Sequence, residues 1–157
     1  MYTVLRVNAN ILTAVLLAIV YYIAYHRLDR SDAFNRKFFR GCQIILTMLL
    51  LEAATCFING NPSKWLIWLS SLIHVFLFSL PPVLTYYWFL LANMLTERAS
   101  VRDIRAKSVH LIPVGLNALA SLLSPFLHWI FYIDAAGMYH RGPMYIPSLL
   151  VSYSYLL

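Results

Sequence analysis

Long apolar runs separated by short clusters of polar and charged residues form the main pattern of this chain. The runs cover residues 7–25, 41–58, 65–95 and 109–123, and a fifth run starts at residue 144. An apolar helix needs about 20 residues to cross a bilayer, so this pattern predicts membrane-spanning helices. We therefore expect an all-α fold, a polytopic transmembrane helix bundle with about five spans, the last of them truncated.

The fifth apolar run is the reason for expecting a truncation. Residues 144–157 would form only about 21 Å of helix, whereas the hydrocarbon core of a bilayer is about 30 Å thick. No charged flank follows this run. The sequence therefore indicates that residues 1–157 are a transmembrane region belonging to a longer protein.

The run 65–95 carries no formal charge and holds Pro81 and Pro82 near its middle, so it could cross the membrane once as a kinked helix or twice as a hairpin. Lys and Arg concentrate in cytoplasmic loops. One crossing places nine basic residues on one side and three on the other, whereas two crossings place six on each side. We therefore predict one helix with Pro81 and Pro82 as its hinge, because neighbouring groups can satisfy the carbonyls that proline frees.

This arrangement also predicts the topology of a multi-pass protein of the cell membrane. The N-terminus lies outside, and the two basic loops, 26–40 and 97–110, are cytoplasmic. The chain is 61% hydrophobic and only 11% charged, against about 25% charged in ordinary soluble proteins. The net charge of +6 is then explained by basic loops beside the lipid bilayer, and no nucleic-acid partner is expected.

Three polar side chains interrupt the apolar runs, namely Glu52, His74 and Asn117. Each is predicted to lie about 10–14 Å below the outer end of its helix, so the three would form one polar layer. A carboxylate in hydrocarbon is costly and marks a candidate functional residue. One interpretation is a ligand-binding or proton-sensing pocket. The alternative is a set of hydrogen bonds that only holds the helices together.

The segment 124–143 is too long and too aromatic for a simple turn. Its apolar residues fall at helical spacing and predict a short amphipathic helix on the outer surface: Phe126, Trp129, Ile130 and Ile133. Asp134, His140 and Arg141 follow this predicted helix. We interpret the segment as a lid that binds a ligand through these polar residues and Trp129, or alternatively as an interfacial anchor whose polar groups satisfy one another.

The sequence gives no sign of metal or catalytic chemistry. Cys42 and Cys56 are predicted to lie about 21 Å apart on one helix, which is too far for a disulfide. No spacing of His, Asp and Glu forms a strong metal site, and the HExxH, GxSxG and phosphate-loop patterns are absent. We assign no catalytic or metal-binding residue, and no cofactor follows from the sequence.

Four stretches carry a more specific pattern. They are the loop entry Arg30-Ser31-Asp32 with Asn35-Arg36, Glu52, Pro81-Pro82 ahead of Tyr86-Tyr87-Trp88, and residues 121–143 with the motifs SLLSP, FYID and YHRGP. Together they resemble the N-terminal multi-pass membrane region of Gram-positive bacterial GGDEF-domain proteins, the diguanylate cyclases. The resemblance implies a sensory input region and a cytoplasmic output domain in the same full-length chain. No GGDEF motif occurs within the 157 residues, so no catalysis is assigned to them.

The combined hypothesis is a sensor that responds to a ligand or to protonation near Glu52, His74 and the segment 124–143 by a change of bend at Pro81 and Pro82. The output domain is expected to be a diguanylate cyclase, and a homodimer is among the candidate assemblies. The competing hypothesis is a small-molecule or ion transporter in which Glu52 is the coupling carboxylate.

Overall fold

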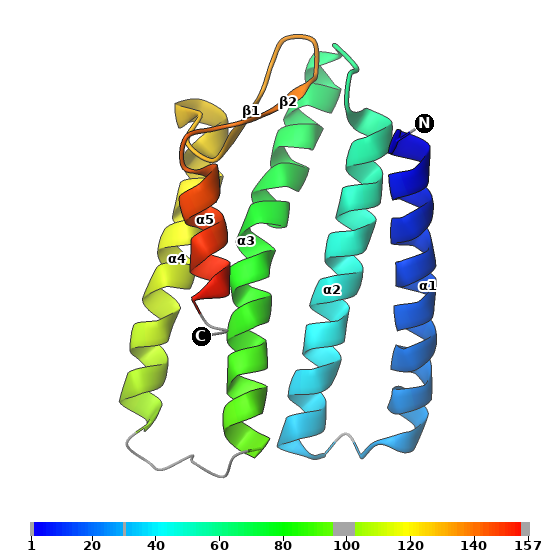
Figure 1. Cartoon of the computed structure of the whole chain (residues 1–157), viewed down its shortest axis with the longest axis vertical. Helices are drawn as coiled ribbons and strands as arrows, with labels where there is room; N and C mark the ends of the chain where they lie inside the picture. Colours follow the sequence, from blue (N-terminus) through cyan, green and yellow to red (C-terminus); the bar gives the residue numbers. More distant parts are fainter. Residues whose placement is uncertain (1, 30, 96–102, 155–157) are drawn as a thin grey trace. The chain divides into compact units, whose positions relative to one another are not determined.

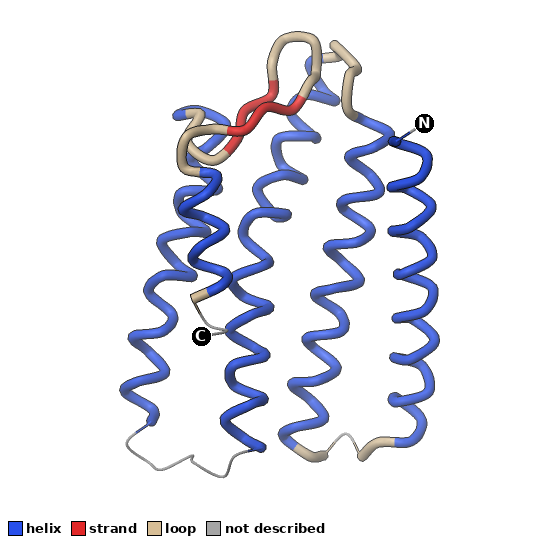
Figure 2. Tube along the Cα trace, in the orientation of Figure 1, coloured by secondary structure: helices blue, strands red, loops and turns tan. Residues whose placement is uncertain are grey.

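The computed structural model describes residues 2–29, 31–95 and 103–154 of the chain. The fold is mostly helical, with five helices and one two-stranded hairpin among these residues (Figures 1 and 2): α1 Tyr2–Arg27, α2 Ala33–Ile58, α3 Lys64–Leu95, α4 Asp103–Leu127, β1 Phe131–Ile133, β2 Tyr139–Arg141 and α5 Tyr145–Tyr153. Two compact units divide the chain, Met1–Phe57 and Ile58–Leu157, and each is described by itself.

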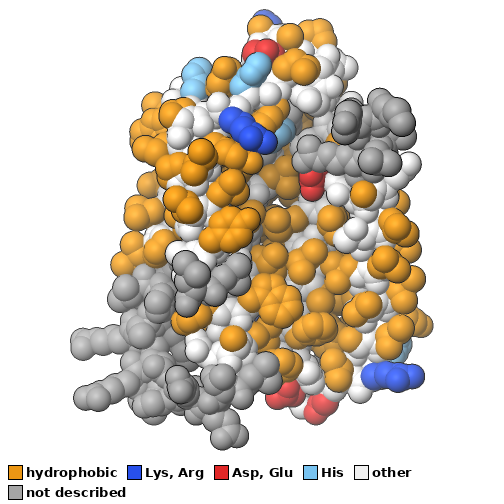
Figure 3. Space-filling model, in the orientation of Figure 1, with side chains coloured by type: hydrophobic (Ala, Val, Ile, Leu, Met, Phe, Trp, Pro, Cys, Tyr) orange, Lys and Arg blue, Asp and Glu red, His pale blue; other side chains and the backbone are white. Residues whose placement is uncertain are grey.

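Three of the described helices are long and apolar enough to cross a membrane, and this indicates a multi-pass membrane protein. The qualifying segments are Asn8–Arg27, Ala33–Ile58 and Lys64–Met94. Hydrophobic side chains cover the visible flanks of the helices, as expected of surfaces that face lipid (Figure 3). The expected fourth and fifth spans are not in this set: within the residues searched, the apolar stretch of α4 is Leu111–Leu127, and α5 has nine residues.

In the first unit, α1 and α2 contact each other through aromatic and polar side chains. The amide Nε2 of Gln43 donates a hydrogen bond of 3.0 Å to the Tyr21 hydroxyl. The rings of Tyr21 and Tyr25 lie 5.5 and 6.1 Å from the ring of Phe39. Most large apolar side chains of α1 are exposed, for example Leu12, which suits a helix in contact with lipid.

The turn between α1 and α2 is shaped by two aspartates. Asp32 accepts a hydrogen bond of 3.1 Å from the Asn35 amide and so caps the start of α2. Asp29 accepts hydrogen bonds from the hydroxyl and the amide of Ser31 at 2.7 and 2.9 Å. These bonds, the hydroxyl first, hold the pKa of the Asp29 carboxyl below its usual value. The Arg36 guanidinium donates to the Ser31 carbonyl and completes the turn.

In the second unit, α3 is one continuous helix that includes Pro81 and Pro82. The prediction of a single helix is confirmed, and the alternative of a hairpin at the two prolines is wrong. The Thr85 hydroxyl donates to the carbonyls of both prolines at 3.1 Å. The helix therefore continues past the prolines with local support from its own side chains.

The segment after α4 differs from the sequence prediction. An amphipathic helix was expected over Phe126, Trp129, Ile130 and Ile133, but α4 ends at Leu127 and the chain then forms the β1–β2 hairpin. The prediction is wrong because these residues do not share one face: Phe126 is exposed and Ile130 is buried. The helix also continues past the end of the apolar run 109–123, since Pro125 lies inside α4. The helix ends where His128 adopts a left-handed backbone with φ of 57°.

The hairpin has the register Phe131↔Arg141, Tyr132↔His140 and Ile133↔Tyr139. Beyond the strands, the Asp134 amide donates to the Met138 carbonyl at 3.0 Å, which leaves a three-residue loop of Ala135, Ala136 and Gly137. This loop is closed by a hydrogen bond of 3.0 Å from the Gly137 amide to the Asp134 carbonyl. Gly137 has φ of 78°, as the left-handed position of this loop type requires. The inward side of the hairpin joins the core of the second unit, where Ile130 and Phe131 pack on Val75 of α3.

The tip of the hairpin docks on the turn between α2 and α3. The Gly60 amide donates to the Gly137 carbonyl at 2.9 Å, and the Tyr139 amide donates to the Asn59 side-chain oxygen at 3.2 Å. The approach is close, because a Cβ atom added to Gly137 would lie 2.3 Å from the Asn61 carbonyl oxygen. Position 137 therefore requires glycine for both its conformation and its space.

This close approach predicts that Gly137→Ala destabilises the second unit by about 1–3 kcal/mol, through the left-handed backbone and the clash. Thermal unfolding in lipid nanodiscs measures the effect. Gly115→Ala is the matched control, because its Cβ would meet nothing within 4 Å, and this variant should keep the wild-type melting temperature. Equal melting temperatures for both variants would contradict the docked tip.

Candidate functional site

The site starts from the two prolines of α3. A proline has no N–H, so the residue four positions earlier loses its helical hydrogen bond. Pro82 therefore frees the Phe78 carbonyl. Asn117 of α4 donates a hydrogen bond of 2.8 Å from its Nδ2 atom to this carbonyl. Asn117 is only 5% exposed, and its side chain thus ties α4 to the proline pair.

His74 lies one helical turn before Phe78 and is only 7% exposed. Its Nδ1 atom is 2.8 Å from the Ser70 carbonyl oxygen, which can only accept, so in this bond Nδ1 carries the proton. The imidazole stacks on the ring of Tyr139 with a centroid distance of 4.7 Å and an interplanar angle of 12°. It also lies 5.5 Å from the ring of Phe131. His74 therefore connects α3 to the inward side of the hairpin.

Phe78 extends this connection toward α5. Its ring stacks on Phe131 at 5.5 Å and meets Tyr145 edge to face at 5.8 Å. The Arg141 guanidinium lies 4.6 Å from the centre of the Tyr145 ring, a cation–π contact. One aromatic cluster thus joins the hairpin, α3 and α5, with the positive charge of Arg141 at its outer edge.

A second polar contact comes from Ser124 of α4, which is fully buried. Its hydroxyl donates to the Phe131 carbonyl at 2.7 Å and accepts from the amides of Ile130 and Phe131 at 2.9 and 2.8 Å. One side chain therefore satisfies three backbone groups where the chain leaves α4. This role of Ser124 was not predicted from the sequence. The available signal was a serine ahead of a proline near the end of an apolar helix.

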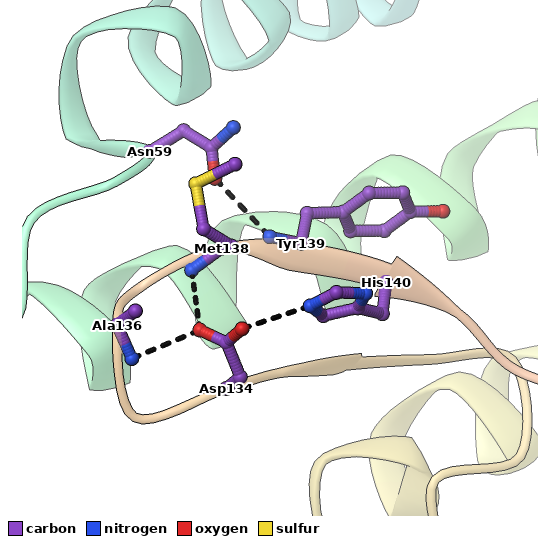
Figure 4. Close-up of polar contacts among 6 residues, drawn as sticks. All are labelled: Asn59, Asp134, Ala136, Met138, Tyr139 and His140. Carbon is purple, nitrogen blue, oxygen red and sulfur yellow. Dashed lines mark hydrogen bonds and ion pairs between the residues drawn. The ribbon is translucent and has the colours of Figure 1, made fainter.

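Asp134 and His140 are brought together on the outward side of the hairpin (Figure 4). The His140 Nε2 atom is 2.9 Å from Asp134 Oδ2, and the amides of Ala136 and Met138 both donate to Oδ1 at 2.9 Å. The hydrogen bond with His140, followed by that from Met138, holds the pKa of the Asp134 carboxyl below its usual value. The carboxylate thus organises the loop of the hairpin.

Other outward residues of this segment point away from the aromatic cluster. His140 stacks on Tyr132 at 5.0 Å, and Tyr132 contacts His128 at 4.9 Å. Trp129 is 41% exposed, and its carbonyl accepts the Met144 amide at 2.8 Å. Of the predicted ligand-binding residues in this segment, Asp134 and His140 are therefore brought together, whereas Arg141 contacts Tyr145 and Trp129 lies at the start of the segment.

Two of the three residues of the predicted polar layer, His74 and Asn117, lie close to each other along α3 and α4. His74 and Asn117 both act on α3 around Phe78. Glu52 lies on α2 in the first unit, is half-buried, and accepts the Thr55 hydroxyl at its backbone carbonyl at 2.7 Å. Its membership of a common layer with His74 and Asn117 stays a prediction.

The described residues include no group of three His, Cys, Asp or Glu side chains that could hold a metal ion. Cys42 and Cys56 are free thiols. No family model, curated protein or solved structure matches the chain.

The contact between Asn117 and Phe78 predicts a double-mutant cycle. Asn117→Ala should destabilise the protein by about 1–3 kcal/mol, because the buried Phe78 carbonyl loses its donor. In a Pro82→Ala background the cost should fall, since the new N–H at position 82 can bond the same carbonyl. Reversible unfolding in detergent measures both costs, and an equal cost in both backgrounds would refute the pairing.

The role of Asp134 predicts a pH dependence. Its folded-state pKa is lower than the ordinary value of 3.8, so the carboxylate contributes stability above about pH 4 that is lost as pH falls through the folded pKa. The protection factors of the Ala136 and Met138 amides, which are hydrogen-exchange rates corrected for the intrinsic rate at each pH, should therefore fall as the pH drops below about 4. Asp134→Asn should show low protection at neutral pH and little further loss of protection on acidification. A wild-type rate in that variant would exclude the carboxylate as the organiser of the loop.

Proposed function

We propose that the chain is a membrane-embedded sensory input region that regulates a cytoplasmic output domain, with a diguanylate cyclase as the expected output. The observation that carries this proposal is the continuous set of contacts from the hairpin to the proline pair. Tyr139 stacks on His74, Phe131 stacks on Phe78, and the Phe78 carbonyl binds Asn117 beside Pro82. A ligand or proton that moves the hairpin would therefore act directly on the bend of α3.

The proposal includes a mechanism. In a helix with a proline, the freed carbonyl allows more than one bend, and the partner of that carbonyl selects among them. Asn117 is this partner, and the aromatic cluster holds the outer part of α3 against the hairpin. A change at the hairpin would then alter the tilt of the inner part of α3, toward the basic loop 97–110.

The proposed topology has the N-terminus outside and the basic loops 26–40 and 97–110 in the cytoplasm. The basic residues Arg27, Arg36, Lys37 and Arg40 flank the turn between α1 and α2, which supports this side as the cytoplasmic one. Residues 96–102 of the second basic loop lie outside the described residues. The hairpin and the turn at residues 59–63 would face the cell exterior.

Transport through Glu52 is the weaker alternative. The contacts that link the hairpin to the proline pair come from α3, α4, α5 and the hairpin itself. None of these contacts requires a coupling carboxylate. Sensing therefore explains more of the described geometry than transport does.

Cysteine labelling tests the topology. In a variant without Cys42 and Cys56, a membrane-impermeant maleimide should modify Ser63→Cys in intact cells. It should modify Ser31→Cys only after permeabilisation, because in the proposed topology α2 crosses the membrane between these two positions, both of which are exposed. Modification of both positions from the same side would overturn the proposed arrangement of α2.

The function is tested with the full-length protein by measuring cyclic di-GMP in cells. Tyr139→Ala removes the ring that stacks on His74, so the cyclic di-GMP level should change relative to wild type. Tyr132→Ala is the matched control, because it removes a ring from the same hairpin on the opposite, outward side, and it should leave the level unchanged. Wild-type levels in both variants, or no effect of the protein on cyclic di-GMP, would contradict the proposal.

A further inference from the structure

Two exposed tryptophans of α3, Trp68 and Trp88, are separated by about 30 Å along the helix axis. Exposed tryptophan rings favour the interface between lipid and water, and the hydrocarbon core of a bilayer is about 30 Å thick. At the hairpin end, the ring of Phe126 lies 6.3 Å from the ring of Trp68, and the apolar stretch of α4 ends at Leu127. This spacing indicates hydrocarbon boundaries near Trp68 and Trp88, with Phe78 midway between them.

The guanidinium of Arg141 lies close to this hydrocarbon layer. It is 4.6 Å from the centre of the Tyr145 ring, and the Tyr145 ring is 5.8 Å from the ring of Phe78. Phe78 follows Trp68 by about 15 Å along α3. Two contacts of this length place the guanidinium no higher than about the level of Trp68, so its charge lies at the hydrocarbon boundary or inside it.

The charge of Arg141 has no partner of opposite sign within the described part of the chain. The hairpin carboxylate, Asp134, is bound to His140 at 2.9 Å, and α5 has no charged residue. Among the described residues, no group accepts a hydrogen bond from the Arg141 guanidinium. The Arg141 side chain is nevertheless exposed. A cation beside hydrocarbon is costly without an anion next to it, and an anion from outside the chain can reach this one.

An apolar face of α5 continues from the Tyr145 ring toward the centre of the bilayer. Ile146 and Leu150 are 66% and 61% exposed, and residues four positions apart lie one above the other on a helix. Hydrophobic side chains cover the visible face of α5 (Figure 3). The cation of Arg141 and this apolar face are therefore adjacent, as the phosphate and the acyl chain of a lipid are.

We propose that Arg141 and the exposed face of α5 bind one anionic phospholipid in the leaflet on the hairpin side. Its phosphate accepts hydrogen bonds from the guanidinium, whose planar N–H groups match phosphate geometry. One acyl chain lies along Ile146 and Leu150. A zwitterionic headgroup brings its own cation, so a lipid with a net negative charge compensates Arg141 better.

The site refines the proposed function by naming the chemical class of the input. A lipid bound to Arg141 fixes the ring of Tyr145, which meets the ring of Phe78. The carbonyl of Phe78 accepts the hydrogen bond from Asn117 beside the proline pair. Lipid composition would then bias the bend of α3. Only this regulatory meaning rests on the proposed function, whereas the lipid site requires only that the second unit spans the membrane.

Photolabelling of the full chain in lipid nanodiscs tests the site. The probes are phosphatidylglycerol and phosphatidylcholine with a diazirine near the carbonyl end of one acyl chain, and mass spectrometry maps the label on α5. Phosphatidylglycerol should label α5 about fivefold more than phosphatidylcholine, the factor expected for one basic residue beside an anionic lipid. Arg141→Gln should reduce the labelling to the phosphatidylcholine level, and Arg141→Lys should keep a preference because it keeps the charge. Lys64→Gln is the matched control, since it removes an exposed basic residue at the hairpin end of α3, and it should retain the wild-type preference.

Three outcomes would overturn the lipid site. They are equal labelling by the two lipids in the wild type, a preference that persists in Arg141→Gln, and an equal loss of preference in Lys64→Gln. Inorganic phosphate is the competing occupant. If millimolar phosphate abolishes the preference in the wild type, the site binds free phosphate and the lipid proposal is wrong, whereas a retained preference supports it. None of these measurements needs an output domain, so failure here is distinct from failure of the cyclic di-GMP experiment.

Discussion

The rest of the second unit depends on satisfying the backbone carbonyl that Pro82 releases inside α3. An unpaired buried carbonyl costs about 1–3 kcal/mol, and more where no water can reach it. Asn117 meets this requirement from α4. A short amide side chain reaches Phe78 only if α4 lies at one height and one rotation against α3. Two serines, Ser121 and Ser124, lie on the same side of α4 as Asn117 and are buried with it. Ser124 is thereby placed to bind the backbone at the start of β1.

The same requirement explains why polar residues gather where the chain changes direction. Ser124 bonds three backbone groups after α4, Asp134 bonds two amides and His140 in the hairpin, and Asn59 bonds the tip of the hairpin. These side chains bond backbone groups that a two-stranded sheet leaves without a ladder partner. Asp134 is thus both a candidate ligand-binding residue and a structural one. Arg141, His140 and Trp129 keep exposed surface, so in the proposed sensor an external ligand would contact these residues.

The sequence predicts the helices more readily than the hairpin. Length and uncharged composition identify α1, α2 and α3, and the distribution of basic residues correctly favours one helix over two at Pro81 and Pro82. The prediction for the segment after α4 is wrong because Phe126, Trp129 and Ile130 are spaced as they would be on one face of a helix. Strand alternation around the loop Ala135-Ala136-Gly137 is the better signal, since a glycine within a three-residue loop is typical of hairpins. The partner of Asn117 could not be predicted, because it depends on how α4 is rotated against α3.

His74 and Asn117 are predictable as unusual residues but not as members of one linked set. His74 lies on α3 one turn before Phe78, whose carbonyl accepts the bond from Asn117. Tilting α3 would therefore displace the Phe78 carbonyl from Asn117 and the His74 ring from Tyr139 together. Such a coupled pair favours two discrete arrangements over a continuous range, because intermediate positions lose both contacts and gain none. In the proposed sensor, the second arrangement would therefore need an alternative hydrogen-bond partner for the Phe78 carbonyl.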